Sequence, residues 1–258
     1  MLIRSLKMPP NHNWTIHANG GSNYESLADK LGGNDIALAY KDDCCGIHFF
    51  AFSHHIDNLT DIALISNRIF SLEIILNGAR RLSSYFDDLY PIRFTGFTDG
   101  NQSHEVSPFS FEDTPFRSDL WIDQQATGSK DPKRHQVSQL IQLAKSDDII
   151  KALIIDAGFI RTVDLRDRIM SWNLLYKMID TIKAGCKRDQ INFKDLTSGS
   201  DLGRFTASCN NMAVIGHNAR HGIKPTKAPT KILTDFEDAS LIVFDICSKF
   251  LDLSLIHI

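Results

Sequence analysis

The residues best suited to chemistry in this chain are two histidines and an arginine near position 220. The stretch IGHNARHGIKP, residues 215–225, contains His217, Asn218, Arg220 and His221. On a helix, His217 and His221 would lie on one face about one turn apart. Histidine titrates near neutral pH and can accept or donate a proton, while a guanidinium can bind phosphate. Such a group could cleave RNA without a metal ion.

The same stretch also has the features of an ordinary helix end. Arg220 and His221 would place cations in a last helical turn, where they complement the helix dipole. Gly222 is a usual residue just after a helix, and Pro225 prevents the helix from continuing. This interpretation accounts for the glycine and the proline without any reaction, and we favour it over RNA cleavage.

Signatures of metals and cofactors are weak in the sequence. The spacing of His217 and His221 would allow zinc ligation, but HNARH lacks the glutamate of H-E-x-x-H and no third ligand follows nearby. The glycines of residues 21–33 do not have the spacing of a phosphate-binding loop. His54 and His55 follow an apolar segment, and we favour a surface position for them over ligation. We therefore expect no metal and no cofactor.

The five cysteines indicate a reducing environment. Their number is odd, and no pair has the C-x-x-C spacing of a zinc or redox motif. Cys209 and Cys247 stand in apolar helical settings and are predicted to be small buried side chains. The adjacent Cys44 and Cys45 could form a redox element, although packing in a strand or turn is favoured. We expect a cytoplasmic location.

The composition is that of a globular chain. Hydrophobic residues make up 43% of the 258 residues, and the net charge is −3, so RNA binding would need a local basic patch. The loop at 222–231 could supply such a patch through Lys224, Lys227 and Lys231, with no acid among them. No run approaches 18 apolar residues, so no membrane span is expected.

The elements that would position these residues fall into two groups. Residues 1–125 are predicted to form an α+β domain, with strands and one packed helix. Apolar or alternating segments predict the strands at 14–18, 35–40, 46–53, 91–97 and 104–111. The helix follows from a stripe of apolar residues, capped by Asn58 or Thr60: Ile62, Ile65, Ile69, Leu72 and Leu76.

The second group is helical. Residues 126–136 are polar and are predicted to be a linker or loop, and residues 137–258 are predicted to form a helical bundle. A capping box of Thr234 and Glu237 would start the last helix. Its buried stripe would consist of Phe236, Ala239, Val243, Ile246 and Phe250.

Three segments of the helical half carry a resemblance to a known group of proteins. They are SWNLLYKMIDTI (171–182), LGRFTASCNNMAVIGHNARHG (202–222) and APTKILTDFEDASLIVFDICSKFL (228–251). Together they resemble a family of uncharacterised, mostly bacterial proteins with a strand-rich front, a helical back, an "ARHG" element, a proline-containing loop and a final helix. The resemblance implies this architecture and a prokaryotic or phage origin. It implies no reaction.

The C-terminal bundle is also similar to HEPN domains, which are helical and are often RNA-cleaving dimers in toxin and antiviral systems. Their motif is an arginine, a polar residue, four to six residues and a histidine. Here His217 takes the place of the arginine and Asn218 that of the polar residue, but only three residues separate His217 from His221. Arg220 directly precedes the histidine, which departs from the motif.

These observations lead to two hypotheses of function. The first is a non-catalytic interaction or regulatory protein, a subunit of a prokaryotic defence or stress assembly that binds a protein partner or a second copy of itself. The alternative is a HEPN-like, metal-independent ribonuclease that acts through His217, Asn218, Arg220 and His221, with RNA held by the lysines of the 222–231 loop.

Overall fold

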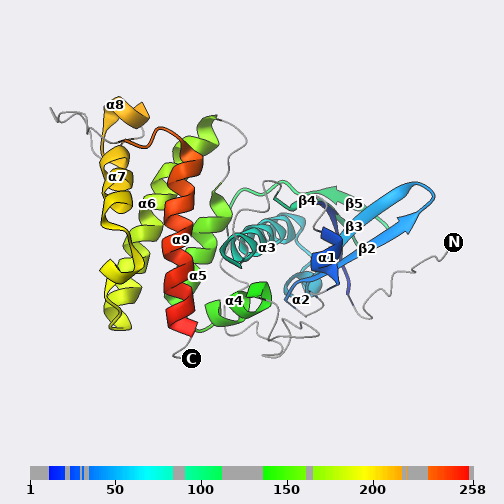
Figure 1. The fold of residues 1–258 in the computed structure, drawn as a ribbon. Helices are drawn as coiled ribbons and strands as arrows, with labels where there is room; N and C mark the ends of the chain where they lie inside the picture. The colour runs from blue at the N-terminus through cyan, green and yellow to red at the C-terminus, as the bar shows by residue number, and fades with distance from the viewer. Residues whose placement is uncertain are drawn as a thin grey trace. The chain divides into compact units, whose positions relative to one another are not determined.

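The chain is a mixed α+β protein with an antiparallel sheet near the N-terminus and a helical C-terminal region (Figure 1). This confirms the predicted fold class. The computed structural model describes residues 12–20, 24–29, 31, 35–83, 91–111, 136–160, 165–216, 219 and 232–255. The chain divides into two compact units, Met1–Arg80 with Asp87–Asp147 and Arg81–Phe86 with Asp148–Ile258.

A five-stranded antiparallel sheet forms the centre of the first unit, in the order β2-β3-β1-β4-β5. The strands are β1 (Thr15–Asn19), β2 (Ala37–Asp43), β3 (Gly46–Phe52), β4 (Arg93–Thr98) and β5 (Ser103–Glu105). Each predicted strand segment overlaps one of them, with ends that differ by one to several residues. The strands β2 and β3 form a hairpin (Figure 1), and the short helix α1 (Tyr24–Ala28) packs beside β2. The Tyr24 hydroxyl donates to the main-chain oxygen of Phe50 at 2.6 Å.

The strand β5 is shorter than the predicted 104–111. After Val106, the main-chain N–H groups turn away from β4 and bond to side chains of α3 (Ile62–Ser83). Ser107 donates to Ser66 Oγ at 2.8 Å, and Phe109 donates to Asn67 Oδ1 at 3.0 Å. Because these polar side chains satisfy the backbone, the chain has no need of further strand pairing there.

The long helix α3 was predicted correctly in position but not in its ends. Its apolar stripe is buried from Ile65 onward, whereas Ile62 is exposed. The cap is Asp61, whose Oδ1 accepts from the N–H groups of Ala63 and Leu64 at 2.9 and 3.2 Å, and not Asn58 or Thr60. By length and composition α3 could cross a membrane, but most of its apolar window is buried inside the chain, as in a core helix.

The first unit also includes the short helix α2 (His54–Asp57) and the helix α4 (Gln136–Ala144). The predicted helical domain began at residue 137, whereas α4 lies in the first unit, with the sheet. Apolar residues on one face of α4 are buried, Leu140 and Ile141 among them. Just after this helix, Lys145 Nζ lies 2.7 Å from Oδ2 of Asp35. Asp35 precedes β2 in the chain.

The second unit is helical. Its elements are α5 (Asp148–Phe159), α6 (Leu165–Arg188), the 3-10 helix η3 (Phe193–Leu196), α7 (Gly199–Cys209), α8 (Met212–Ile215) and α9 (Phe236–Leu255). The helix α6 packs against α5 and α9 (Figure 1). The predicted stripe of α9 is buried throughout. Its cap is Asp235, whose Oδ1 accepts from the Glu237 N–H at 2.9 Å, in place of the predicted Thr234 capping box.

Candidate metal centre

The site predicted from sequence lies outside the described residues. This holds for His217, Asn218, Arg220 and His221, and equally for the loop lysines Lys224, Lys227 and Lys231. Just before them, α8 ends at Ile215 and Gly216 has a φ of 62°, in the left-handed region that ends helices. The catalytic and RNA-binding roles of these seven residues therefore stay predictions.

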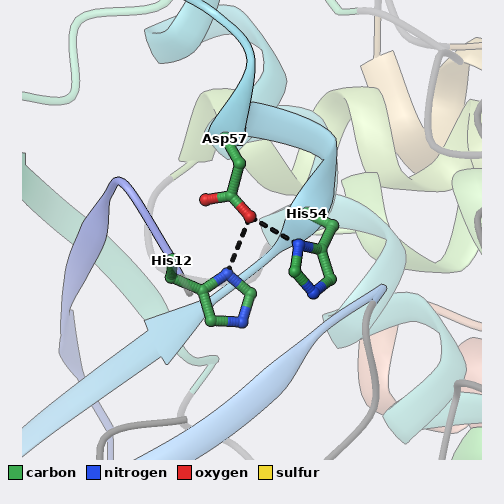
Figure 2. A group of neighbouring side chains, drawn as sticks. All are labelled: His12, His54 and Asp57. Carbon is green, nitrogen blue, oxygen red and sulfur yellow. Dashed lines mark hydrogen bonds and ion pairs between the residues drawn. The ribbon is translucent and has the colours of Figure 1, made fainter. Parts of the chain in front are cut away.

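Within the described residues, a different set of side chains comes together around α2. This helix follows β3 directly, and Ser53 begins it by accepting a hydrogen bond from the His55 N–H at 3.2 Å. His54 and Asp57 are three residues apart on the helix, so their side chains share one face. The segment leading into β1 places His12 beside the same face (Figure 2).

Two imidazoles converge on one carboxylate oxygen. His12 Nδ1 lies 2.9 Å and His54 Nδ1 lies 2.6 Å from the same atom, Asp57 Oδ2 (Figure 2). The two ring centroids are 4.3 Å apart, with the planes tilted by 30°. Phe52 covers His12, with a centroid distance of 5.5 Å.

The other atoms of Asp57 hold the segment before β1 in place. Asp57 Oδ1 accepts from the Asn13 main-chain N–H at 3.0 Å, and the Asp57 main-chain oxygen accepts from Asn13 Nδ2 at 2.8 Å. Trp14 Nε1 donates to the main-chain oxygen of Leu59 at 3.2 Å. Asp57 is thus positioned by contacts outside the pair of imidazoles, and its Oδ2 stays directed at them.

Burial sets the protonation of His12. Its side chain is 5% exposed, that of Asp57 is 8% exposed and that of His54 is 26% exposed. Burial lowers the pKa of His12, the Asp57 charge raises it, and the nearby His54 lowers it, with a net decrease. His12 is therefore neutral at neutral pH, which is the form that ligates metals or accepts a proton.

The adjacent His55 fixes α2 from its other side. Its Nε2 lies 2.9 Å from Asp35 Oδ1, and the second oxygen of Asp35 is the one that pairs with Lys145. The His55 side chain is 2% exposed, so the expected surface position is wrong for His55, while His54 is partly exposed. The polar environment is the reason, because a buried imidazole is tolerated where a carboxylate can accept its proton.

Sequence reasoning missed this group because its members are far apart in the chain. His12 and Asp57 are separated by 45 positions, and no sequence pattern shows that they meet. The local signal was Ser53-His54-His55-Ile56-Asp57, a cap followed by a histidine and an acid at i, i+3. That spacing identifies two of the three residues.

The three residues form a set that could hold a metal ion. One ligand atom from each of His12, His54 and Asp57 can be chosen so that all lie within 4.8 Å of one another. Two imidazole nitrogens and one carboxylate oxygen suit zinc and other divalent transition metals. Without a metal, the same contacts act as a hydrogen-bonded clasp between α2 and the segment before β1.

Comparison of the chain with protein-family models, with curated proteins and with solved structures gave no match. The resemblances described from the sequence therefore stay predictions.

Proposed function

We propose that the first unit binds a divalent transition-metal ion through His12, His54 and Asp57. The observation that supports this most is the convergence of both Nδ1 atoms on Asp57 Oδ2, at 2.9 and 2.6 Å. Asn13 and one imidazole would already give each oxygen of Asp57 a hydrogen-bond donor and would complete a clasp. The second imidazole on the same oxygen is what a chelating set requires.

Metal binding needs only a small change in this arrangement. Ligand atoms around a tetrahedral centre with bonds of about 2.0–2.1 Å lie about 3.3 Å apart, so each nitrogen would move from Oδ2 by about half an ångström. His54, the most exposed of the three, lies where an ion can enter. The ion would take the place of the hydrogen bonds between the two Nδ1 atoms and Asp57, each imidazole then carrying its proton on Nε2, and it would balance the carboxylate charge.

Three protein ligands leave at least one coordination position for water or substrate. Structural zinc sites have four protein ligands, whereas catalytic ones have three and lower the pKa of the bound water to about 7. We therefore place this site with mononuclear hydrolytic centres. Its substrate would be polarised by the metal, and the imidazoles of His12 and His54 would serve as ligands and not as acids.

The test is metal binding by the full chain. Co²⁺ gives visible absorption when it enters a four- or five-coordinate site with nitrogen and oxygen ligands, and Zn²⁺ should displace it. In a background with Cys44 and Cys45 replaced by serine, which removes the exposed thiols as competing ligands, we expect one tightly bound ion. His54→Ala in this background should lose at least about 100-fold in affinity, because even outer-shell residues of metal sites contribute about 10–100-fold.

The matched control is His17→Ala. His17 is a half-buried histidine of β1 whose ring lies 5.8 Å from that of Phe50 and outside the cluster, so its variant should bind Co²⁺ as the wild type does. Circular dichroism would confirm that both variants are folded. A folded wild type that takes up no Co²⁺ or Zn²⁺, or a His54→Ala variant with wild-type affinity, would show that the group is only a clasp.

The earlier hypotheses have their own tests. Cleavage of labelled RNA in EDTA that is lost in His221→Ala would support a HEPN-like ribonuclease. Intact self-association without cleavage would support the interaction or regulatory protein of a defence assembly. The chelator separates these activities from the metal site, since EDTA would abolish only the latter. A cytoplasmic location, a protein partner and RNA binding are proposed on the same footing.

A further inference from the structure

The tip of the β2–β3 hairpin carries two adjacent thiols. Asp43 and Gly46 are the last paired residues, so Cys44 and Cys45 form the two-residue loop between the strands. Gly46 has a φ of 121°, a conformation that favours glycine and allows the tight return. Both cysteines are exposed, whereas Cys186, Cys209 and Cys247 are buried. The two sulfur atoms lie 3.9 Å apart.

We propose that Cys44 and Cys45 chelate a thiophilic divalent cation of the Zn²⁺ and Cd²⁺ class. A tetrahedral centre with metal–sulfur bonds of about 2.3 Å holds two sulfur atoms about 3.8 Å apart. The observed 3.9 Å is already this spacing. A disulfide would need the sulfur atoms to close to about 2.05 Å within a loop of two adjacent residues. The geometry therefore favours chelation over oxidation.

A third ligand lies beside the thiols. Ligand atoms of Asp43, Cys44 and Cys45 can be chosen within 4.8 Å of one another. The Cys45 N–H donates to Asp43 Oδ1 at 2.9 Å. This bond holds the Asp43 side chain toward the loop that carries both sulfur atoms.

A fourth ligand is within reach on the facing strand. His48 Nε2 lies 3.5 Å from Asp43 Oδ1, and its side chain is about half exposed and so has room to turn toward the tip. Lys41 Nζ occupies the other carboxylate oxygen at 3.0 Å, and it would have to leave only if both oxygens coordinated. Two thiolates, one carboxylate and one imidazole are ligands that zinc commonly takes.

The binding step involves no oxidation. Each S–H bond breaks, its proton passes to the buffer, and its electron pair forms a bond to the cation, so two metal–sulfur bonds replace two S–H bonds. The charge of Asp43 and the two thiolates offsets that of the ion. This site shares no residue with His12, His54 and Asp57, and it does not rest on the function proposed for them.

Cadmium titration of the reduced, full-length protein tests this proposal. Cadmium bound to thiolates has a strong ultraviolet charge-transfer band that imidazole and carboxylate ligands lack. We expect this band in the wild type with release of about two protons per ion. Cys44→Ser and Cys45→Ser should each weaken binding by at least about 100-fold, as loss of a direct ligand must exceed the roughly 10–100-fold effect of outer-shell residues. The double variant should lack the band.

Two controls make the result specific. Cys186→Ser removes a buried thiol of α6 and should leave the band unchanged. His54→Ala should also retain it, so that failure of the histidine site and failure of the hairpin site can be told apart. A band that is absent from the reduced wild type, or that persists in the double variant, would overturn the proposal. So would a reduced protein that takes up no cadmium but forms a Cys44–Cys45 disulfide in air.

Discussion

Asn13 donates two hydrogen bonds to Asp57, one from its main-chain N–H to the carboxylate and one from its side-chain amide to the main-chain oxygen. These bonds connect the segment before β1 to α2 without using the oxygen that faces the two imidazoles. The carboxylate therefore has two separable roles, one in joining the segments and one at Oδ2. A substitution that preserves the first role can test the second.

Asp57→Asn is that substitution. The amide oxygen can still accept from the Asn13 N–H, but the amide nitrogen would face two N–H donors and cannot bind a cation. We expect metal affinity to fall by at least about 10–100-fold. Replacing charged with neutral hydrogen bonds should lower the free energy of unfolding by about 1–3 kcal/mol.

Asn13→Ala is the comparison for this experiment. It removes the amide contact to the Asp57 main-chain oxygen, while the main-chain N–H contact to the carboxylate stays. Its free energy of unfolding should drop by about 1 kcal/mol. Its metal affinity should stay close to that of the wild type, because all three ligands remain. Calorimetric titration and urea denaturation measure both quantities. Equal loss of metal affinity in the two variants would indicate that Asp57 acts only by holding the segment.

Asp35, which binds the opposite side of α2 through His55, is expected to contribute strongly to the stability of the first unit. It bridges Lys145 and His55, and all three side chains are buried. Asp35→Ala would remove the carboxylate that pairs with the buried ammonium group of Lys145, and breaking a buried pair in this way costs about 3–5 kcal/mol. Chemical denaturation of the variant measures the loss.

The control is a pair on the surface of the other unit. Lys249 Nζ lies 2.6 Å from Asp245 Oδ2 on α9, where both side chains are about half exposed. Solvent screens such a pair, so Lys249→Ala should leave the unfolding midpoint almost unchanged. If Asp35→Ala were as mild as Lys249→Ala, the contacts of Asp35 would contribute little to the fold.

Thiol reactivity should divide the five cysteines into two classes. Burial raises the pKa of Cys209 and of Cys247 to about 12, and burial followed by the Asp189 charge raises that of Cys186. At pH 8 the three buried cysteines therefore stay as unreactive thiols, because the thiolate is the nucleophile. A disulfide reagent at pH 8 in EDTA should modify Cys44 and Cys45 quickly, and all five only after unfolding.

Mass spectrometry of the modified peptides would identify the sites. Raising the pH toward 10 should not make Cys209 or Cys247 reactive while the protein stays folded, since their pKa values are about 12. Rapid modification of either residue in the native protein would contradict the burial of α7 and α9 in the second unit.

Elements with a strong local signal could be predicted from the sequence. The apolar stripe of α9 records which face is buried, so its position followed directly. The strand β4 also lies where its alternation predicted, but a register shift between Phe94 and Gly96 buries both Phe94 and Phe97. The ends of the elements depend on single hydrogen bonds. Asp61 and Asp235 cap their helices in place of neighbours that are equally good caps by type.

The candidate site could be predicted only in part. His54 and Asp57 are recognisable as an i, i+3 pair, but His12 reaches them through the pairing of β1 with β3 and through Asn13. Such contacts depend on tertiary structure, and a single sequence carries no local mark of them. The same holds for Lys145, which meets Asp35 from 110 positions away.

Gly185 is predicted to be required for the close packing of α6 against α9. A Cβ atom at this position would lie 2.5 Å from Cζ and 2.9 Å from Cε2 of Phe250, and 3.0 Å from Cγ2 of Ile149. Gly185→Ala would gain about 1 kcal/mol of helix propensity. The buried Phe250 ring has little room to move, so overpacking of about 1–3 kcal/mol should outweigh this gain and lower the unfolding midpoint.

Gly203→Ala provides the opposite expectation in the same unit. Gly203 lies inside α7, and a Cβ atom there would meet nothing within 4 Å, so the substitution should stabilise the protein by up to about 1 kcal/mol. A second variant, Gly185→Ala with Phe250→Leu, should lose less stability than the sum of its parts, because the shorter side chain vacates the space. Additive losses, or stabilisation by Gly185→Ala alone, would show that α9 can shift away from α6 at little cost.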